Sequence, residues 1–324
     1  MIEIQTQDAR MKDIIRLAEG TAATKNAVLI QGENGTGKNT LAKFIHEKSN
    51  RAAASLVTVN CAQQPEMLLE TELFGFEKGA FAGTVSEKRG KFEIANGGTL
   101  VLDNVSELPA KLQAKILKVL ETGLVERIGS KGGIPVDVRI IAITNKNITE
   151  TINTGKFSEN LFFRVSTTQI MLPPLRERTA DMKAIALDML ASISARSSKK
   201  ANAIADEAVE KLCSMEFTGN LRELEGILER AILHAVEGTV RAENIMSGNS
   251  LEALHQGSGA HSQNWEELAR WIPGRTLDDI ERAVILSSLD HNNGNRTHTA
   301  RELGISIRTL RNKLNLYRKA GISV

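Results

Sequence analysis

A nine-residue run near the start of the chain constrains its fold more than any other feature. Residues 31–39 read Gln-Gly-Glu-Asn-Gly-Thr-Gly-Lys-Asn, between an apolar run and a helical pattern. The run satisfies Gly-x-x-x-x-Gly-Lys, in which glycines let backbone N–H groups surround phosphate oxygens while the lysine contributes a point charge. Asn39 stands where Ser or Thr is usual. We therefore predict an ATP site made by Gly32, Glu33, Asn34, Gly35, Thr36, Gly37, Lys38, Asn39 and Thr40.

A second motif follows about sixty residues later. Residues 97–103 read Gly-Gly-Thr-Leu-Val-Leu-Asp, an apolar strand that ends in an acid. Asp103 could cap the next helix, but beside a phosphate loop it is the expected ligand of Mg²⁺. ATP and Mg²⁺ are therefore the predicted cofactors.

The first half of the chain alternates short apolar runs with helix-period segments. The predicted strands are residues 27–30, 56–59, 99–102, 138–143 and 168–172, and Leu108, Leu112, Ile116 and Leu120 mark a helix that Gly123 ends. This alternation predicts an α/β fold with a parallel sheet. After Pro173 and Pro174 only helical patterns remain. We predict a nucleotide-binding subdomain over 1–172, a helical lid over 173–246, a linker over 247–264 and an all-α module over 265–324.

Composition excludes several classes of protein. Of 324 residues, 41% are hydrophobic and 25% are charged, as in a globular chain and unlike a disordered one. No apolar run reaches the roughly 18 residues that a membrane helix needs, and the first residues do not resemble a secretory signal. Cys61 and Cys213 stand alone, so we expect reduced thiols and a cytoplasmic protein with no membrane contact.

Positive charge gathers at the C-terminal end. Between Arg296 and Lys319 there are seven basic residues and one acid, Glu302, although the whole chain carries only +2. The remainder is therefore net acidic, at −4. A basic end on an acidic body predicts contact with double-stranded DNA through that end alone.

The same segment has a helix-turn-helix pattern. One helix is expected from Thr276, a short one over 297–303, a turn at Gly304 and a last helix over 307–317 capped by Ser306. In the last helix we expect a buried stripe of Ile307, Leu310 and Leu314. An ordinary solvated helix would not explain the local charge. The predicted base contacts are Arg308, Thr309 and Asn312, and the predicted phosphate contacts and flanking cations are Arg296, Arg301, Arg311, Lys313, Arg318 and Lys319.

Several long strings resemble the AAA+ core of the bacterial sigma-54-dependent transcription activators. They are GENGTGK at 32–38, ETELFGFEKGAF at 70–81, GGTLVLD at 97–103, LPPLRER at 172–178 and GNLRELE at 219–225. They cover residues 5 to 246 in the family's order, and the C-terminal module resembles the family's dimeric Fis-type helix-turn-helix, most closely that of flagellar-gene regulators. The resemblance implies a hexameric ATPase ring, of one or of two kinds of chain, that remodels RNA polymerase bearing sigma-54.

The resemblance also assigns roles to single residues. Asn145 would sense the γ-phosphate, Arg222 would be a second sensor, and Arg164 would be an arginine finger that reaches the neighbouring subunit. Asn60 would be the switch residue that pairs with the catalytic glutamate. The sigma-54 contact, GAFTGA in the family with its phenylalanine at the tip, would be made here by Gly79, Ala80, Phe81, Ala82, Gly83 and Thr84.

The chain departs from this family at catalytic positions. Asn104 replaces the glutamate that polarises the attacking water, and losing a general base costs about 10²–10⁴ in rate. Ser158 replaces the family's other arginine finger, which contributes about 10³–10⁵. Ala82 and Thr84 alter the sigma-contacting loop. We expect weak hydrolysis, unless a nearby acid such as Glu107 substitutes.

Three functions remain open at this point. The chain could be a DNA-binding regulator whose nucleotide-bound core works in mixed rings with an intact paralogue. It could be a fully active ATPase and activator of sigma-54 polymerase that tolerates the substitutions. It could instead be a repressor or sigma-70-directed regulator that uses ATP only for assembly.

Overall fold

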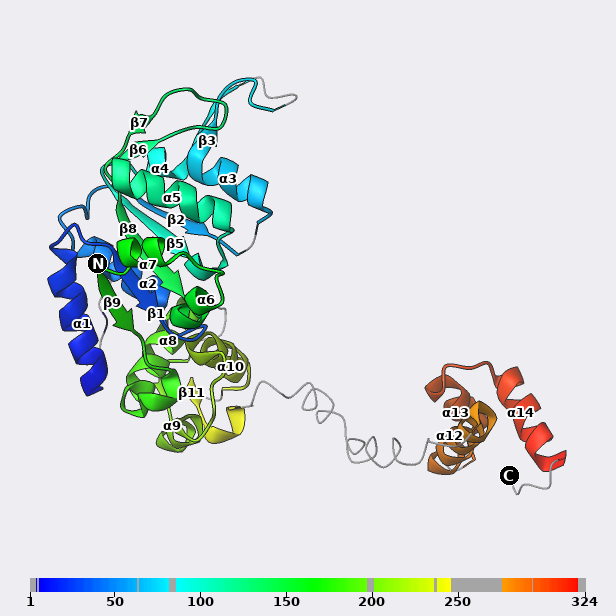
Figure 1. The fold of residues 1–324 in the computed structure, drawn as a ribbon. Helices are drawn as coiled ribbons and strands as arrows, with labels where there is room; N and C mark the ends of the chain where they lie inside the picture. Colours follow the sequence, from blue (N-terminus) through cyan, green and yellow to red (C-terminus); the bar gives the residue numbers. More distant parts are fainter. Residues whose placement is uncertain are drawn as a thin grey trace. The chain divides into compact units, whose positions relative to one another are not determined.

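The computed structural model describes residues 4, 6–62, 64–81, 86–196, 201–235, 238–245, 276–292 and 294–319. The chain divides into two compact units, Met1–Gly248 and Asn249–Val324 (Figure 1). The predicted linker at 247–264 lies outside the described residues. Within those residues, no helix has both the length and the apolar character needed to cross a membrane.

The first unit is built on a five-stranded parallel sheet in the order β2-β5-β8-β1-β9. Its strands are β1 (Val28–Gln31), β2 (Leu56–Asn60), β5 (Thr99–Asp103), β8 (Arg139–Thr144) and β9 (Thr168–Met171). All five predicted strands are therefore confirmed, and no strand end differs by more than one residue. Because parallel strands end at the same edge, Gln31, Asn60, Asp103 and Thr144 come to one side of the sheet.

Helices cover both faces of this sheet (Figure 1). One face packs on α1 (Ala9–Ala22) and α2 (Lys38–Glu47), through a cluster that includes Ile30, Ile45 and Ile141. The other face packs on a larger cluster that includes Leu102, Ile116 and Leu161. Its helices are α3 (Glu66–Phe74), α4 (Lys91–Ile94), α5 (Ala110–Thr122), α6 (Ile148–Asn153) and α7 (Glu159–Val165).

The helix predicted from the leucine spacing is α5. Leu112 and Ile116 are fully buried, and Gly123 ends the helix with a φ of 67°, a left-handed conformation that favours glycine. Leu108 is buried as well, but it precedes the helix because Pro109 occupies the N-cap. A short turn, η1 (Val105–Glu107), links β5 to α5.

Two short hairpins project from this unit and were not predicted. The strands β3 (Gly75–Phe76) and β4 (Lys88–Arg89) pair antiparallel, as do β6 (Leu124–Val125) and β7 (Ile134–Pro135). Each strand has two residues, which is too short for an alternating pattern to appear in the sequence. The first hairpin frames the segment 77–87.

A helical subdomain follows β9, as predicted. It contains η2 (Leu175–Glu177), η3 (Thr179–Asp181), α8 (Met182–Arg196), α9 (Asp206–Cys213), α10 (Asn220–His234) and η4 (Ala242–Asn244), packed around one apolar cluster. The sequence predicted no further strands after Pro174. That was wrong in one detail, because β10 (Ala203–Ile204) pairs parallel with β11 (Thr239–Val240).

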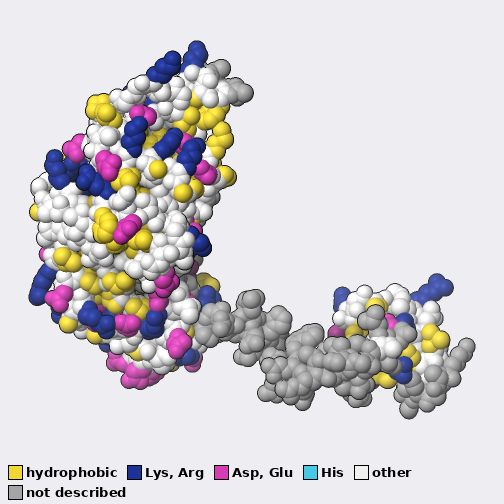
Figure 2. Space-filling view, in the orientation of Figure 1, with side chains coloured by type: hydrophobic (Ala, Val, Ile, Leu, Met, Phe, Trp, Pro, Cys, Tyr) yellow, Lys and Arg dark blue, Asp and Glu magenta, His cyan; other side chains and the backbone are white. Residues whose placement is uncertain are grey.

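The second unit contains three helices in its described residues, α12 (Leu277–His291), α13 (Arg296–Glu302) and α14 (Ile307–Lys319). A small cluster of Ile285, Ala300, Leu310 and Leu314 holds them together. The helix-turn-helix prediction is confirmed in its elements, and dark-blue basic side chains project from this unit in Figure 2. One expectation was wrong. Ile307 is 40% exposed, because the first residue of α14 extends beyond the cluster that buries Leu310 and Leu314.

Candidate functional site

The loop after β1 has the backbone of a phosphate-binding loop. Gly35 and Gly37 have φ values of 77° and 99°, and Gly37 is the N-cap of α2. A Cβ on Gly35 would lie 2.1 Å from the carbonyl oxygen of Gly219, so only glycine fits there. The glycines of the motif thus allow both the left-handed backbone and the close approach of the lid. Thr36 is buried in this loop, whereas Asn39 and Thr40 are exposed at the start of α2.

Lys38 folds back over the loop. Its Nζ donates hydrogen bonds to the carbonyl oxygens of Gly32 and Glu33, at 2.8 and 2.6 Å. Burial lowers the pKa of the Lys38 ammonium; Asp103 opposes this shift, while the positive charge of Arg222 adds to it. Arg222, in the first turn of α10, is therefore close enough to act on the same charge as Lys38. The predicted sensor and the phosphate-loop lysine belong to one site.

The strand-end acid faces this loop. Asn39 Nδ2 donates to Asp103 Oδ2 at 3.1 Å, so the residue in the usual Ser/Thr position contacts the predicted metal ligand directly. Asp103 lies opposite Asn60 in the register of β2 and β5. A carboxylate and an amide oxygen are suitable ligands for Mg²⁺, which usually takes one or two protein carboxylates together with phosphate oxygens.

Asn104 stands where the resemblance places a catalytic glutamate. Its Nδ2 donates to Asn60 Oδ1 at 3.1 Å, and the same oxygen accepts the N–H of Ala62 at 3.0 Å. Asn104 has φ 58° and ψ 46°, a left-handed conformation that asparagine tolerates better than most residues. The predicted switch pair is therefore present as two neutral amides.

Glu107, the acid that the sequence offers as a substitute base, forms an ion pair. One carboxylate oxygen lies 2.5 Å from Lys146 Nζ, and the side chain is about one-third exposed. Its negative charge is already compensated by this ion pair. Beside it, Asn145 donates from Nδ2 to Asn34 Oδ1 at 2.9 Å, which places the predicted γ-phosphate sensor against the phosphate loop.

The lid is clamped to the phosphate loop by residues that the sequence analysis did not single out. Arg176 donates from both terminal nitrogens to the Glu33 carboxylate, at 2.8 and 2.6 Å. Asn220 is fully buried with φ 52°, and its Nδ2 donates to Glu33 Oε2 and Asn34 O. Its Oδ1 accepts the N–H of Leu175 at 2.7 Å. Arg176 and Asn220 lie within two of the strings that resemble the family, at 172–178 and 219–225. Those strings were the only sequence feature that could have pointed to them.

This clamp sets the charge of Glu33. The hydrogen bonds from Arg176, and then the one from Asn220, lower the pKa of the Glu33 carboxyl from 4.5 to about 2. The Glu33 carboxyl is therefore ionised at neutral pH. The lid and the loop are linked by a charged contact that a bound nucleotide would have to accommodate.

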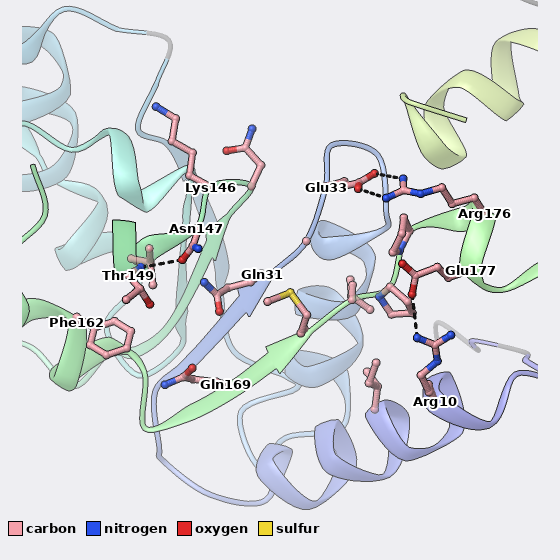
Figure 3. A pocket seen from close by; sticks show the side chains of 18 residues that line it. Arg10, Gln31, Glu33, Lys146, Asn147, Thr149, Phe162, Gln169, Arg176 and Glu177 are labelled. Carbon is pink, nitrogen blue, oxygen red and sulfur yellow. Dashed lines mark hydrogen bonds and ion pairs between the residues drawn. The ribbon is translucent and has the colours of Figure 1, made fainter. Parts of the chain in front are cut away.

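A cleft of about 730 Å³ opens beside the loop, at the β1–β9 end of the sheet (Figure 3). Lys146, Asn147, Thr149 and Phe162 stand on one side of it and Arg176, Glu177 and Arg10 on the other, with Gln31 and Gln169 between them. The pairs Arg176–Glu33 and Arg10–Glu177 lie on its rim. The cleft borders Gly32 and Asn145, so it adjoins the phosphate loop.

Arg164 lies elsewhere. Its guanidinium donates twice to the carbonyl oxygen of Leu120, at 3.2 and 2.6 Å, in a depression lined by Ala27 and Val138. These residues precede β1 and β8, whereas the phosphate loop follows β1. The phosphate loop and Arg164 therefore lie at opposite ends of the strands. The length of β8, six residues at about 3.3 Å each, separates these two ends of the sheet. Arg164 therefore does not reach the phosphate loop of its own chain.

Ser158 acts as a helix cap. Its Oγ accepts the N–H of Leu161 at the start of α7, and its own N–H donates to Gln113 Oε1 at 2.7 Å. The position of the family's other arginine finger thus carries a short structural side chain and no positive charge.

The predicted sigma-contacting loop is described only in part. Gly79, Ala80 and Phe81 are described. The Phe81 ring packs edge-on against the Phe76 ring, with 5.9 Å between the ring centroids. Ala82, Gly83 and Thr84 lie outside the described residues. The buried Arg127 holds both stems of the loop through ion pairs to Glu77, Glu87 and Glu93.

The predicted DNA contacts lie on α13 and α14. Arg296, Arg301, Arg308, Arg311 and Asn312 are exposed. Two others have structural partners.

The Thr309 hydroxyl bonds to Ser306 Oγ at 2.8 Å, and Ser306 Oγ also accepts the N–H of Thr309 in the helix cap. Lys313 forms an ion pair with Glu281 of α12 at 2.5 Å. Arg318 and Lys319 belong to α14, but their side chains lie outside the described residues.

Comparison with protein families gives three matches along the chain. The Sigma-54 interaction domain matches residues 4–171, the AAA+ ATPase lid domain matches 176–261, and the bacterial regulatory protein, Fis family, matches 276–317. The first match covers the sheet, the phosphate loop and the loop of Phe81. The last covers α12 and α13 and most of α14.

Whole-chain comparisons agree with these matches. The transcriptional regulatory protein FlbD of Caulobacter vibrioides is 39% identical over 98% of this chain and 71% of its own length. The nitrogen fixation protein AnfA of Azotobacter vinelandii is 38% identical over 95% of this chain, which spans 56% of that protein. The crystal structure of NtrX from Brucella abortus in complex with ATP is 29% identical with a TM-score of 0.71, over 97% of this chain and 69% of that one. The chain therefore belongs to the family of sigma-54-dependent bacterial transcriptional regulators with an AAA+ core and a Fis-type helix-turn-helix.

Proposed function

We propose that this chain is a DNA-binding regulator that binds ATP and Mg²⁺ but hydrolyses ATP weakly. The phosphate loop, Lys38 and the Asn145–Asn34 contact support nucleotide binding, as does the likeness to a structure solved with ATP. Asp103 with Asn39 supports a magnesium site. Mg²⁺ would neutralise charge on the phosphates, and this chain's own residues would hold and orient them.

The observation that carries weak hydrolysis is the hydrogen bond between Asn104 and Asn60. An amide can hold a water molecule but cannot take its proton, and general-base catalysis contributes about 10²–10⁴ in rate. Glu107, the obvious substitute, is already paired with Lys146. Ser158 offers no charge for the transition state, so both departures lower turnover.

We further propose that the core works in a ring with other subunits, most simply a hexamer. Arg164 lies at the far end of the sheet from its own phosphate loop, so any phosphate that it contacts belongs to another copy. A paralogue with the glutamate and both arginines would supply what this chain lacks. The domain limits in this proposal are those expected from the sequence: 1–172, 173–246, 247–264 and 265–324.

Transcription from a sigma-54 promoter in vitro tests this function. The chain alone should give little open complex with sigma-54 polymerase. A mixture of the chain and an intact paralogue should give more open complex than the paralogue alone. Lys38→Ala, which removes the phosphate contact, is the control and should abolish the gain. Full activation by the chain alone would contradict weak hydrolysis, and no effect in any mixture would contradict a role with sigma-54.

A further inference from the structure

The first residue of α14 is exposed although it is large and apolar. Ile307 is 40% exposed, while Leu310 and Leu314 on the same helix are 0% and 2% exposed. Ile307 is not among the residues of the cluster that holds α12, α13 and α14 together. Packing among the described residues of this unit therefore does not explain an isoleucine at this position.

Its place on the helix points to a contact with DNA. In a helix-turn-helix unit, the N-terminal residues of the second helix contact base edges in the major groove. Ile307 follows the cap residue Ser306 directly, and the exposed Arg308 stands beside it. The exposed Arg296 and Arg301 on α13 and the exposed Arg311 on α14 add positive charge to the same unit, which suits an approach to the phosphate backbone.

The chemistry of the side chain selects one base. Thymine is the base that presents a methyl group in the major groove, and apolar side chains recognise it by contact. A β-branched residue is stiff at χ1, so Ile307 loses little freedom when it makes that contact. We propose that Ile307 contacts the C5-methyl group of a thymine in the DNA site of this regulator.

Two polar neighbours complete the reading surface. Arg308 can donate two hydrogen bonds to a guanine and Asn312 can form a bidentate pair with an adenine. Thr309 is left out because its hydroxyl belongs to the helix cap, and Lys313 is left out because it pairs with Glu281. The DNA site therefore contains a thymine read by Ile307, in addition to the bases that Arg308 and Asn312 read. This inference rests on the proposed DNA-binding function.

The test begins with the full chain and random duplex DNA, from which the preferred site is selected in vitro. Each thymine of that site is then replaced by deoxyuridine, which removes only the methyl group. At one position the affinity should fall about fourfold, the value of one buried methyl group. Ile307→Ala should bind the thymine site about as weakly and should not distinguish thymine from deoxyuridine there.

Leu316→Ala is the matched control. Leu316 is 60% exposed on the same helix, more than two turns away, and this variant should keep the full thymine preference. If no thymine is sensitive, or if Ile307→Ala keeps the sensitivity, the inference is wrong while DNA binding stands. If the chain selects no sequence and binds no DNA, the proposed function fails and this inference with it.

Discussion

Asn104 and Asn60 are joined by a hydrogen bond of 3.1 Å between two neutral amides, at the end of adjacent parallel strands. In this arrangement Asn104 is the donor and Asn60 the acceptor. A glutamate at position 104 would reverse the roles, because a carboxylate only accepts. The pair therefore contains no group that could take a proton from a water molecule.

Replacing Glu107 tests whether it has taken over as the base. Because its carboxylate is paired with Lys146, we predict that Glu107→Gln leaves residual phosphate release within about twofold of the unchanged chain. The assay is steady-state phosphate release at saturating ATP. A loss of about 100-fold would mean that Glu107 performs the missing step.

Ser158→Arg should restore one arginine finger at a structural cost. Loss of the Ser158 cap on α7 should lower the free energy of unfolding by about 1 kcal/mol. In mixed rings with an intact paralogue, the added charge should raise phosphate release by about tenfold or more.

Ser158→Gln is the control for this change, since it loses the cap and lengthens the side chain without adding charge. It should be destabilised to the same extent and should not gain turnover. Equal turnover of the two variants would show that position 158 does not face a neighbour's nucleotide.

Asn220 should be the most sensitive residue of the lid clamp. Asn220→Ala leaves the buried N–H of Leu175 and the carbonyl of Asn34 without partners and places alanine at φ 52°. We predict a loss of about 3 kcal/mol in the free energy of unfolding. Asn220→Gly removes the same bonds without backbone strain, so it should lose about 1 kcal/mol less. A change below about 0.5 kcal/mol in both variants would contradict the clamp.

The Glu33–Arg176 pair predicts an acid-sensitive contribution to stability. The folded pKa of Glu33, about 2, lies below its ordinary 4.5, so the stabilisation is complete above about pH 5 and is lost as pH falls toward 2. Both side chains are more than 40% exposed, so solvent screening limits the effect to about 1 kcal/mol. The free energy of unfolding, measured at about pH 6 and at about pH 3, should be lower at the lower pH, and Glu33→Gln should reduce this difference. An unchanged difference would contradict the pair's role.

Much of the fold could be predicted because the strong signals are local. The apolar runs that form β1, β5 and β8 are buried on both faces, so they appear in the sequence as continuous apolar runs without alternating polar residues. The glycines of the phosphate loop directly indicate its left-handed backbone. Asp103 lies near Lys38 and Asn39 because parallel strands end at one edge of the sheet.

What could not be predicted depends on contacts between distant parts of the chain. The bond between Asn220 and Glu33 joins residues 187 positions apart, and no periodicity reports it. Ile307 followed the apolar spacing of Leu310 and Leu314, but spacing cannot show that Ile307 lies outside the cluster that buries them. Lys313 looked available for DNA because its ion-pair partner, Glu281 of α12, is 32 positions away.

The most direct test of the account measures ATP binding and phosphate release on the same samples of the natural chain and Asn104→Glu. Asn104→Gln is the matched control, because it shares the longer side chain and the strain at φ 58° but offers no base. All three should bind ATP with similar affinity. Phosphate release should be barely detectable in the natural chain and in Asn104→Gln, and should rise by about 10² in Asn104→Glu. Comparable release by the natural chain and Asn104→Glu would show that Asn104 does not limit hydrolysis, and would contradict the central claim.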